Sequence, residues 1–341
     1  MTNQEKQIPN LIKDEQYLMD LFQQRIKNID SQGDKILRID NHFVKKHFDD
    51  KFFHFVLYNN ITLKTITGLR KRYIILCISF SGHKRQKMYQ ALELIYQHGF
   101  SKGDIIVPKP LWYIDELMAA FYIGVPGDNL LEHIKNGYLD LKLIKKIAQG
   151  LAKFHQIVPP KNLKLKKHSF APVYLDPTNI IHRDYNKNTL LAKDVLAQFK
   201  KLKKLQSTLI KSNYFFSHGD FHPENVIINR FNNNQIIFID FSEICLAPIY
   251  YDIASFLQQL QFMTSSYLSI EEYKQIEYTF IATYFNNQKI DQTIMNKINL
   301  YKAWTSLKSV IYFMIFEDKA NRDFAEYLLT QSEDYLRQIK I

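Results

Sequence analysis

Two carboxylates and an amide stand at fixed spacing within residues 217–241. Asn225 lies five residues after Asp220, and Asp240 follows a later apolar run. A carboxylate beside a hydroxyl can orient it and accept its proton. Amide and carboxylate oxygens suit Mg²⁺, whose remaining ligands can be water and nucleotide phosphates. These residue types are therefore the ones that transfer of a phosphoryl group requires.

The three side chains need a frame that brings them together. Two β-branched runs, at residues 226–228 and 236–239, flank an asparagine-rich turn at residues 232–234. Short apolar runs joined by such a turn predict a β-hairpin. A hairpin places its first and last residues at the same end, so it would bring Asn225 close to Asp240.

This stretch resembles the catalytic segment of the aminoglycoside phosphotransferase and choline kinase family. The family's catalytic loop reads His-Gly-Asp-x-x-x-x-Asn, here residues 218–225, and its metal site reads Ile-Asp-Phe, here residues 239–241. A further family Asp opens the helix that braces the loop, and Asp252 stands at that distance. The resemblance implies that Asp220 is catalytic, that Asn225 and Asp240 bind Mg²⁺, and that His218 and Asp252 support the loop.

The resemblance also implies an α+β, bilobal, protein-kinase-like fold that uses ATP, with GTP as an alternative. The small N-lobe would be an antiparallel sheet with one packed helix, and the larger C-lobe would be mainly helical. A second motif, His182-Arg183-Asp184, looks like the protein-kinase catalytic triplet. Its Asn188 comes only four residues after the Asp, and no hairpin with a second carboxylate follows. We interpret it as a surface loop.

Composition agrees with a soluble two-lobed enzyme. The 341 residues exceed the usual size of a single core, and 46% are hydrophobic. The N-terminus has no signal-peptide pattern, and no apolar run approaches the length of about 18 residues that a membrane span needs. The two cysteines, Cys77 and Cys245, lie far apart, which indicates a reducing compartment. The sequence thus predicts a cytoplasmic protein, and no specific nucleic-acid module is visible.

The first part of the chain alternates between helical and strand patterns. We expect a helical extension at residues 1–36 with its amphipathic helix at 13–30, and an N-lobe at 37–124. Strand-like runs occupy residues 53–58, 61–66 and 73–80, with Asn59-Asn60 and Thr67-Gly68 as separators. A helix at 87–98 closed by Gly99 follows, and the resemblance makes residues 121–125 the hinge.

The C-lobe is predicted to span residues 125–341 and to be built mostly of helices. It would contain a helix at 141–154, a basic insert at about 156–211 and the catalytic hairpin at 217–241. Further helices are expected at roughly 249–263, 270–285, 291–316 and 323–338.

The nucleotide site departs from the family pattern. The resemblance implies a phosphate-covering turn between the first two strands, for which residues 65–72 are the candidate, and adenine contacts through a hinge backbone. Cys77 stands where the family has a phosphate-binding Lys, and Glu93 lies one turn beyond the position of the Glu that holds that Lys. Since neither partner would persist alone, two interpretations stay open: a basic residue of the turn binds phosphate, or the protein is a pseudokinase. The expected nucleotide-binding residues are Gly68, Arg70, Lys71, Arg72, Tyr122, Ile123 and Gly124.

Charge is uneven along the chain. Residues 140–211 carry a balance of +12, and residues 241–341 a balance of −3. The basic insert suggests an anionic acceptor or partner, and its alternative is a solvated lysine face. Acids that can hold a cationic acceptor, or else form a solvated face, are Glu271, Glu272, Glu277, Glu317, Asp318 and Asp323. Aromatics that can form part of a cage for a choline-like acceptor, or else core, are Tyr301, Trp304, Tyr312 and Phe313.

The sequence therefore predicts an ATP-dependent phosphotransferase that acts on a hydroxyl of a small molecule such as an aminoglycoside, an amino alcohol or a sugar. The alternative is a catalytically silent, pseudokinase-like module that docks an anionic partner through the basic insert.

Overall fold

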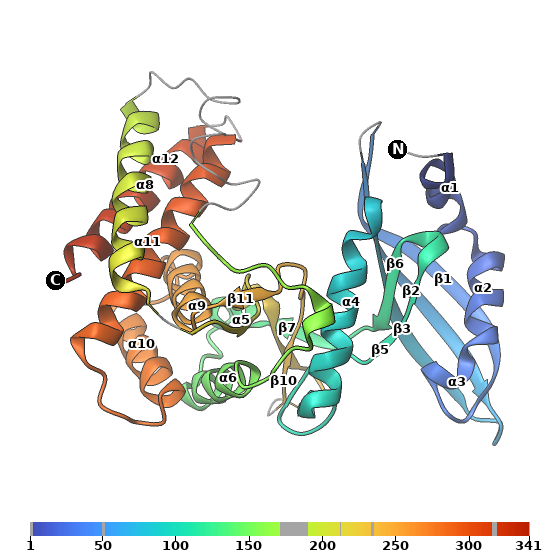
Figure 1. Cartoon of the computed structure of the whole chain (residues 1–341). Helices are drawn as coiled ribbons and strands as arrows, with labels where there is room; N and C mark the ends of the chain where they lie inside the picture. Colours follow the sequence, from blue (N-terminus) through green and yellow to red (C-terminus); the bar gives the residue numbers. More distant parts are fainter. Residues whose placement is uncertain are drawn as a thin grey trace. The chain divides into compact units, whose positions relative to one another are not determined.

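The computed structural model describes residues 3–49, 52–170, 190–211, 213–232, 235–315 and 319–340. The chain forms two compact units (Figure 1). Unit 1 comprises Met1–Asp128 and Ile227–Ser242, and unit 2 comprises Asn129–Val226 and Glu243–Ile341. A sheet-based unit and a largely helical unit together give the predicted α+β class.

An antiparallel five-stranded sheet forms most of unit 1, in the order β1-β2-β3-β6-β5. Burial alternates along β2, as expected when only one face of a sheet is fully covered. The strands are β1 (Gly33–Phe48), β2 (Phe53–Thr65), β3 (Arg70–Phe80), β5 (Pro110–Ile114) and β6 (Ala119–Ile123).

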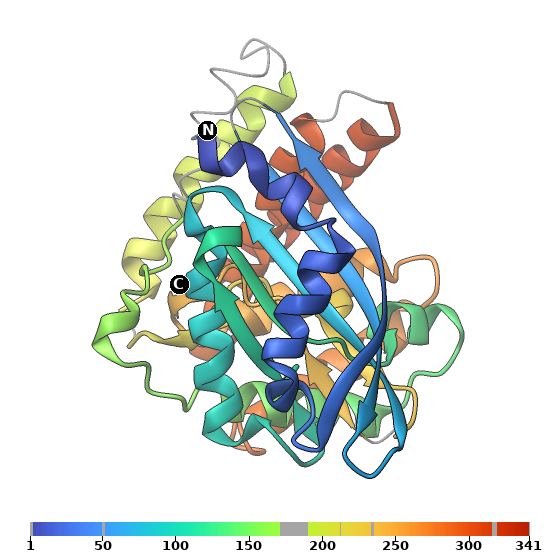
Figure 2. The same cartoon turned by 90° about the vertical axis from the view of Figure 1, so that its right-hand side faces the viewer.

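Helices cover this sheet from both sides. The helices α1 (Asn3–Leu11), α2 (Glu15–Gln24) and α3 (Ile26–Ile29) lie across one face, as Figure 2 shows, and α4 (Lys84–Ile95) lies on the other (Figure 1). Phe22 of α2 contacts Trp112 and Phe121 of the sheet, with ring centroids 6.0 and 5.9 Å away. The N-terminal helices are thus part of the core of unit 1.

The predicted helix at 13–30 is broken into α2 and α3. Asp14 caps α2 by accepting the N–H of Tyr17, and Arg25 leaves the helical conformation between the two helices. The helix predicted at 87–98 begins three residues earlier, and a π-helical turn, Tyr96–Phe100, closes it with Gly99 at φ 88°. Glycine adopts this left-handed conformation without strain.

The separator expected at Asn59-Asn60 is wrong. β2 runs straight through it, and inside the sheet Nδ2 of Asn59 donates to the Ile75 carbonyl at 3.1 Å. The long strand β1 precedes it, so Asp49–Phe52 joins the first two strands and the turn at 65–70 joins the second and third.

A second sheet carries the predicted hairpin. Its strand order is β4-β10-β9-β7, and β10 runs parallel to β4. Neighbouring β9 and β10 form the hairpin that the sequence predicts, although turn residues 233 and 234 lie outside the described residues. The strands are β4 (Ile105–Ile106), β7 (Gly127–Asn129), β9 (Val226–Asn229) and β10 (Ile236–Phe238).

Unit 2 is largely helical, as predicted. The helix α6 has the predicted bounds, and α9 to α12 lie close to the four predicted C-terminal helices. Trp304 of α11 is buried and stacks on Phe170 at 4.8 Å. The helices are α5 (Leu130–Lys135), α6 (Leu141–Phe154), α8 (Leu190–Leu209), α9 (Tyr250–Met263), α10 (Ile270–Tyr284), α11 (Gln292–Ile315) and α12 (Lys319–Arg337). A two-stranded ladder joins β8 (Phe215–Ser217) to β11 (Cys245–Ala247). Single 3₁₀ turns lie at Ser81–His83 and Asp115–Leu117 in unit 1, and at Lys161–Leu163 and Pro223–Asn225 in unit 2.

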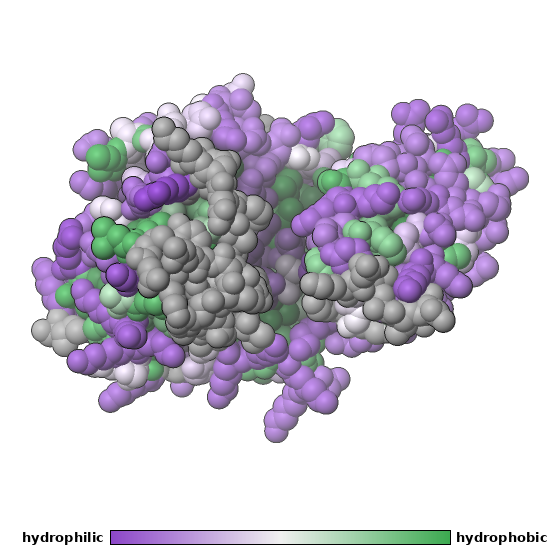
Figure 3. Space-filling model, turned by 90° about the horizontal axis from the view of Figure 1, so that it is seen from above, coloured by the Kyte–Doolittle hydropathy of each residue, from purple (hydrophilic) through white to green (hydrophobic). Residues whose placement is uncertain are grey.

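Hydrophilic residues dominate the face seen in Figure 3, and hydrophobic residues gather there only in small groups. Within the described ranges, every helix is too short or too polar to cross a membrane.

Candidate functional site

The predicted catalytic loop starts where β8 ends. Gly219 has φ 84°, and a Cβ at this position would lie 2.0 Å from the Glu243 carbonyl oxygen. Only glycine fits such a turn. The turn separates His218, which is buried, from Asp220, whose side chain is 37% exposed.

Asp252 fixes this loop from the first turn of α9. Its carboxylate accepts the N–H groups of His218 and Gly219 at 2.8 and 2.9 Å, and it lies 2.9 Å from Nε2 of His155. Tyr251 donates its hydroxyl to the Gly219 carbonyl at 3.0 Å. Burial alone would raise the pKa of Asp252, but the hydrogen bond with His155 and nearby positive charge keep that pKa below its ordinary value. The loop is thus held by a buried, charged and fully bonded anchor.

Asp220 lies beside two basic side chains. Its Oδ1 is 3.5 Å from Nζ of Lys308, and its Oδ2 is 3.7 Å from Nε2 of His222. Burial acts to raise the pKa of Asp220, but His222 and the Lys308 charge hold it below the usual range. An ionised carboxylate that solvent can reach is the form that accepts a proton from a hydroxyl.

Asn225 is tied into the same loop. Its Nδ2 donates to the Asp220 carbonyl at 2.9 Å and lies 3.0 Å from Nε2 of His222. These contacts use the amide nitrogen, so the amide oxygen is the atom that can face a cation. Asn225 directly precedes β9, the first strand of the hairpin.

Asp240 follows β10, the second strand of the hairpin, and belongs to unit 1. Its backbone has φ 58°, and its Oδ1 accepts the N–H of Ser242 at 3.2 Å. Positive φ is uncommon outside glycine, and such positions cluster at functional sites. One carboxylate and one amide oxygen are hard ligands that fit Mg²⁺ if phosphate oxygens and water complete its shell. In the described parts of the chain, no group of three or more His, Cys, Asp or Glu residues can hold a metal by itself.

The predicted adenine-binding segment lies at the end of β6. The Ile123 N–H donates to the Lys109 carbonyl at 2.9 Å, and the Gly124 N–H donates to the Ile74 carbonyl at 2.7 Å. A base bound here would therefore have to use carbonyl groups of this segment instead of these two N–H groups. Tyr122 pairs with Leu76 of β3 on the half-buried face of the sheet.

The turn that contains Gly68 joins β2 to β3, so its predicted position between the first two strands is wrong. Arg70 and Arg72 are exposed. Lys71 instead bonds buried Asp30 at 2.7 Å, together with the Tyr73 hydroxyl. The hydrogen bond from Lys71, then that from Tyr73, lowers the pKa of Asp30 to about 2. Lys71 therefore holds the sheet to α3.

Cys77 is fully buried in the core that includes α1, α2 and α3. The opposite, half-buried face of β3 carries Leu76 and Ile78, so Cys77 points away from that face. No lysine follows Lys71 in β3. Glu93 of α4 accepts the Tyr89 hydroxyl at 2.8 Å, which gives this acid a local role.

Two of the acids proposed for a cationic acceptor have structural roles. Glu272 completes a capping box with Ser269 at the start of α10, and Glu277 forms an ion pair with Lys302. Glu271 and Asp323 are exposed. Glu317 and Asp318 lie outside the described residues, and so does the motif at 182–188.

The aromatic and basic candidates also divide into buried residues, exposed residues and residues outside the described part. Tyr301 and Trp304 are buried core residues, so they cannot line an open cage, whereas Tyr312 is exposed. In the basic insert, α8 buries Phe199 and Leu202 and turns its lysines to solvent. Residues 171–189 of the insert lie outside the described part.

Three residues that contact the catalytic loop or the sheet were not identified from the sequence: His155, Lys308 and Arg85. His155 ends a Leu-x-x-x-His pattern that resembles the family, but its contact with Asp252 was not foreseen. Lys308 and Arg85 carry no local motif, because each reaches its position only through tertiary packing.

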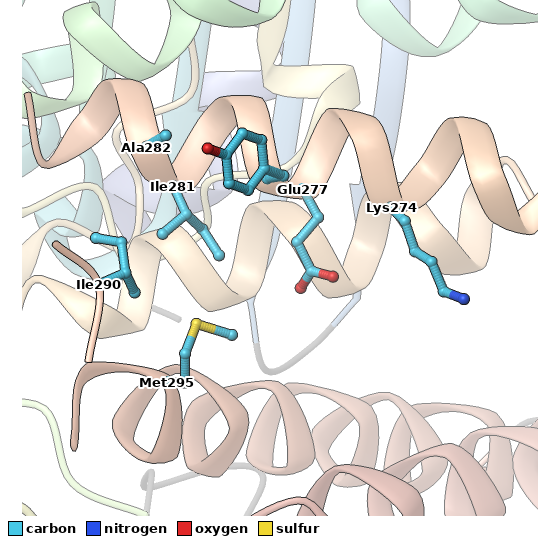
Figure 4. A pocket seen from close by; sticks show the side chains of 7 residues that line it. Lys274, Glu277, Ile281, Ala282, Ile290 and Met295 are labelled. Carbon is cyan, nitrogen blue, oxygen red and sulfur yellow. The ribbon is translucent and has the colours of Figure 1, made fainter. Parts of the chain in front are cut away.

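A separate pocket lies between α10 and α11, and none of the predicted catalytic, metal or nucleotide residues lines it. Its walls are Lys274, Glu277, Tyr278, Ile281, Ala282, Ile290 and Met295 (Figure 4).

Solved structures share this fold. A spectinomycin phosphotransferase in complex with ADP and spectinomycin is 14% identical, with a TM-score of 0.61 and coverage of 95% of this chain and 98% of that one. An ethanolamine kinase from Plasmodium vivax is 16% identical, with a TM-score of 0.61 and coverage of 99% and 98%. An amicoumacin kinase with AMP-PNP and Ca²⁺ is 14% identical, with a TM-score of 0.63 and coverage of 97% and 96%. These likenesses confirm the predicted kinase-like fold.

Sequence comparison gives a second result. A search of curated proteins found no match. The model of the phosphotransferase enzyme family matches residues 66–277, which include the loop, the hairpin and Asp252. The chain therefore belongs to the phosphotransferase enzyme family.

Proposed function

We propose that this protein is a small-molecule kinase that moves the γ-phosphoryl group of ATP, or of GTP, to a hydroxyl group. The observation that carries the proposal is Asp220: an ionised, half-exposed carboxylate on a loop that Asp252 fixes by two N–H bonds. Solved neighbours in complex with ADP, AMP-PNP and GDP support the choice of a nucleotide as donor.

In the proposed reaction, Asp220 orients the acceptor hydroxyl and receives its proton. The acceptor oxygen forms a bond to the γ-phosphorus as the bond from that phosphorus to the ADP oxygen breaks. Asn225 and Asp240 would hold Mg²⁺ through their oxygens, and a bound Mg²⁺ would neutralise phosphate charge. His218 and Asp252 position the loop without touching substrate.

On the acceptor side, we propose a neutral or anionic molecule in preference to a polycation. Lys308 places a positive charge 3.5 Å from the carboxylate that must meet the acceptor. Glu272 and Glu277, which a cationic acceptor could have used, are engaged by Ser269 and Lys302. Repulsion from Lys308 would therefore disfavour an ammonium group next to the reacting hydroxyl. Among the acceptor classes that the sequence left open, sugars fit this charge pattern best.

The alternative function is a silent module that docks an anionic partner through the exposed lysines of α8. Those lysines form the polar face of an amphipathic helix, which is the ordinary arrangement for a helix that packs against others. The enzyme proposal is favoured because a silent module has no need for the bonded loop around Asp220. We also propose a cytoplasmic location, which agrees with two free thiols, Cys77 and Cys245.

The test is a transfer assay with γ-labelled ATP, Mg²⁺ and a panel of sugars, amino alcohols and aminoglycosides. We expect label to appear in at least one acceptor, first among the sugars. A parallel thermal melt should show stabilisation by ATP and Mg²⁺, about 2.7 kcal/mol at a hundred times the dissociation constant. If the protein shows no transfer and no stabilisation, the silent module is favoured and the kinase proposal is overturned.

A further inference from the structure

The missing strand lysine leaves the question of which cation meets the phosphates. On the half-buried face of β3, the side chains opposite α1–α3 include Leu76, Ile78 and Phe80, all apolar. Lys71 is engaged by Asp30. A polyphosphate carries several negative charges and requires positive partners. The cations on this side of β3 are Arg70 and Arg72, at the exposed end of the strand, so a cation beside Ile78 and Phe80 must come from another element.

Arg85, in the first turn of α4, stands over this face. Its guanidinium carbon lies 5.2 Å from the Phe80 ring centroid, and its Nη2 lies 3.4 Å from Nε2 of His54. His54 and Phe80 are paired across β2 and β3, so their side chains share one face of the sheet. Stacking on a ring and contact with an imidazole hold the guanidinium at this end of the sheet.

The guanidinium of Arg85 retains hydrogen-bonding capacity. Its Nε is buried and has no hydrogen-bond partner in the described parts of the chain, and no carboxylate is seen to pair with it there. An unpaired buried donor costs free energy, so such a group is usually paired with a ligand or with water. Arginine stays charged at all relevant pH values and matches phosphate oxygens with two parallel donors.

Two further basic residues lie on this face of the sheet. Lys45 pairs with Val56 and His47 pairs with His54 in the β1–β2 register, which puts both on the half-buried face. Burial and then the charge of Arg85 lower the pKa of His54 to about 4, while Asp240 acts on it in the opposite direction. Tyr122 of the predicted hinge pairs with Leu76 on this same face. The face thus carries a cationic group on the side of the sheet that also carries the predicted hinge residue.

We propose that Arg85 binds the phosphate groups of the nucleotide and takes over the role of the strand lysine, with His54 and Phe80 holding its guanidinium in place. This inference rests on the proposed function. It also accounts for the joint loss of the lysine and its glutamate: α4, which would have supplied an acid to hold a lysine, supplies the cation itself. An arginine steadied by Phe80 and His54 needs no carboxylate partner.

The test is calorimetric titration of the Arg85→Ala protein with ATP, ADP and adenosine in the presence of Mg²⁺. Loss of a charged hydrogen-bonding partner should weaken ATP and ADP about tenfold to a hundredfold and leave adenosine unchanged. Arg85→Lys, which keeps the charge but not the paired donors, should lie between this variant and the wild type. Lys64→Ala, which removes an exposed charge from β2, is the matched control and should bind all three as the wild type does.

Three results would overturn the inference while leaving the proposed function intact. One is ATP affinity of Arg85→Ala equal to that of a wild type that binds and transfers phosphate. The second is a selective loss of ATP affinity in Arg72→Ala in place of Arg85→Ala, which would assign the phosphate contact to the start of β3. An equal loss of ATP and adenosine affinity would also contradict it, and a thermal melt of each variant identifies misfolding as the cause. If the wild type binds no nucleotide, the proposed function fails first.

Discussion

The catalytic loop of unit 2 and the half-buried sheet face of unit 1 differ in how completely their polar and charged groups are paired. Around Asp252, buried polar groups from three separate segments, at residues 155, 218–219 and 251–252, bond to one another. On the sheet face, Lys45, His54 and Arg85 come from separate elements, and Arg85 keeps a donor without a partner in the described residues. The loop is fixed before any ligand arrives, whereas the sheet face has capacity left for one. The following predictions test this contrast, beginning with the largest expected effect.

Removal of the proton acceptor should affect chemistry alone. Asp220→Asn should lower turnover about a thousandfold, the usual contribution of general base catalysis, because the amide cannot take the proton. The affinity for ATP should stay unchanged, since the loop is held by Asp252 and not by Asp220. Steady-state transfer rates and calorimetry give both values. Asp194→Asn, an exposed acid on α8, is the control, and turnover that survives in Asp220→Asn would refute the role of Asp220.

Removal of the anchor should affect the stability of the loop. Asp252→Ala leaves the His218 and Gly219 N–H groups and the His155 ring without their buried acceptor. The free energy of unfolding should fall by about 3–5 kcal/mol, as when one partner of a buried ion pair is deleted. Urea denaturation measures this loss. Asp334→Asn, which breaks an exposed pair with Arg337, should change it by less than about 1 kcal/mol. Equal losses in the two variants would mean that Asp252 is no special anchor.

These two predictions concern residues that the sequence could identify, and the reason is physical. The loop, the hairpin and Asp252 keep fixed spacing within residues 217–252: a glycine at a forced turn, β-branched runs and an acid in the first turn of α9. The sheet face depends on register, and only the folded sheet shows that Cys77 points into the core with α1–α3 and away from the half-buried face. Asn59 was taken for a turn residue because only the folded sheet supplies its partner, Ile75. Lys308 and Arg85 reach their positions through packing of distant segments, so no spacing rule could have found them.

A smaller effect is expected for the acceptor side. Lys308→Met removes the charge beside Asp220 and should raise kcat/KM for an ammonium-bearing acceptor about fivefold relative to a neutral one, the value of a partly exposed charge contact. Competition between a matched amino sugar and its hydroxyl analogue measures the ratio. Lys297→Met on the same helix serves as the control. An unchanged ratio in Lys308→Met would show that this lysine does not select the acceptor.

The smallest effect is expected for the ion pair of Asp30 and Lys71, and it tests whether Lys71 has a structural role or binds phosphate. The folded-state pKa of Asp30 is about 2, below its ordinary value of 3.8. Its stabilising effect is therefore present above pH 3.8 and is lost as the pH falls toward about 2. Asp30→Asn should lose about 1 kcal/mol or less at neutral pH, because Lys71 is partly exposed, and its stability should fall less steeply in acid. Urea midpoints at several pH values test this. Lys71→Ala should share the loss and bind ATP normally, and weakened ATP binding would restore the phosphate role that the sequence suggested.

The most direct test of the central claim is the dependence of ATP affinity on Mg²⁺. Isothermal titration with and without Mg²⁺ should show a gain in affinity for the wild type. Asp240→Asn and Asn225→Ala should each reduce that gain by about tenfold or more, since each removes a proposed oxygen ligand. A full Mg²⁺-dependent gain in both variants would contradict the account, because the metal would then be held without the amide and the acid of the hairpin.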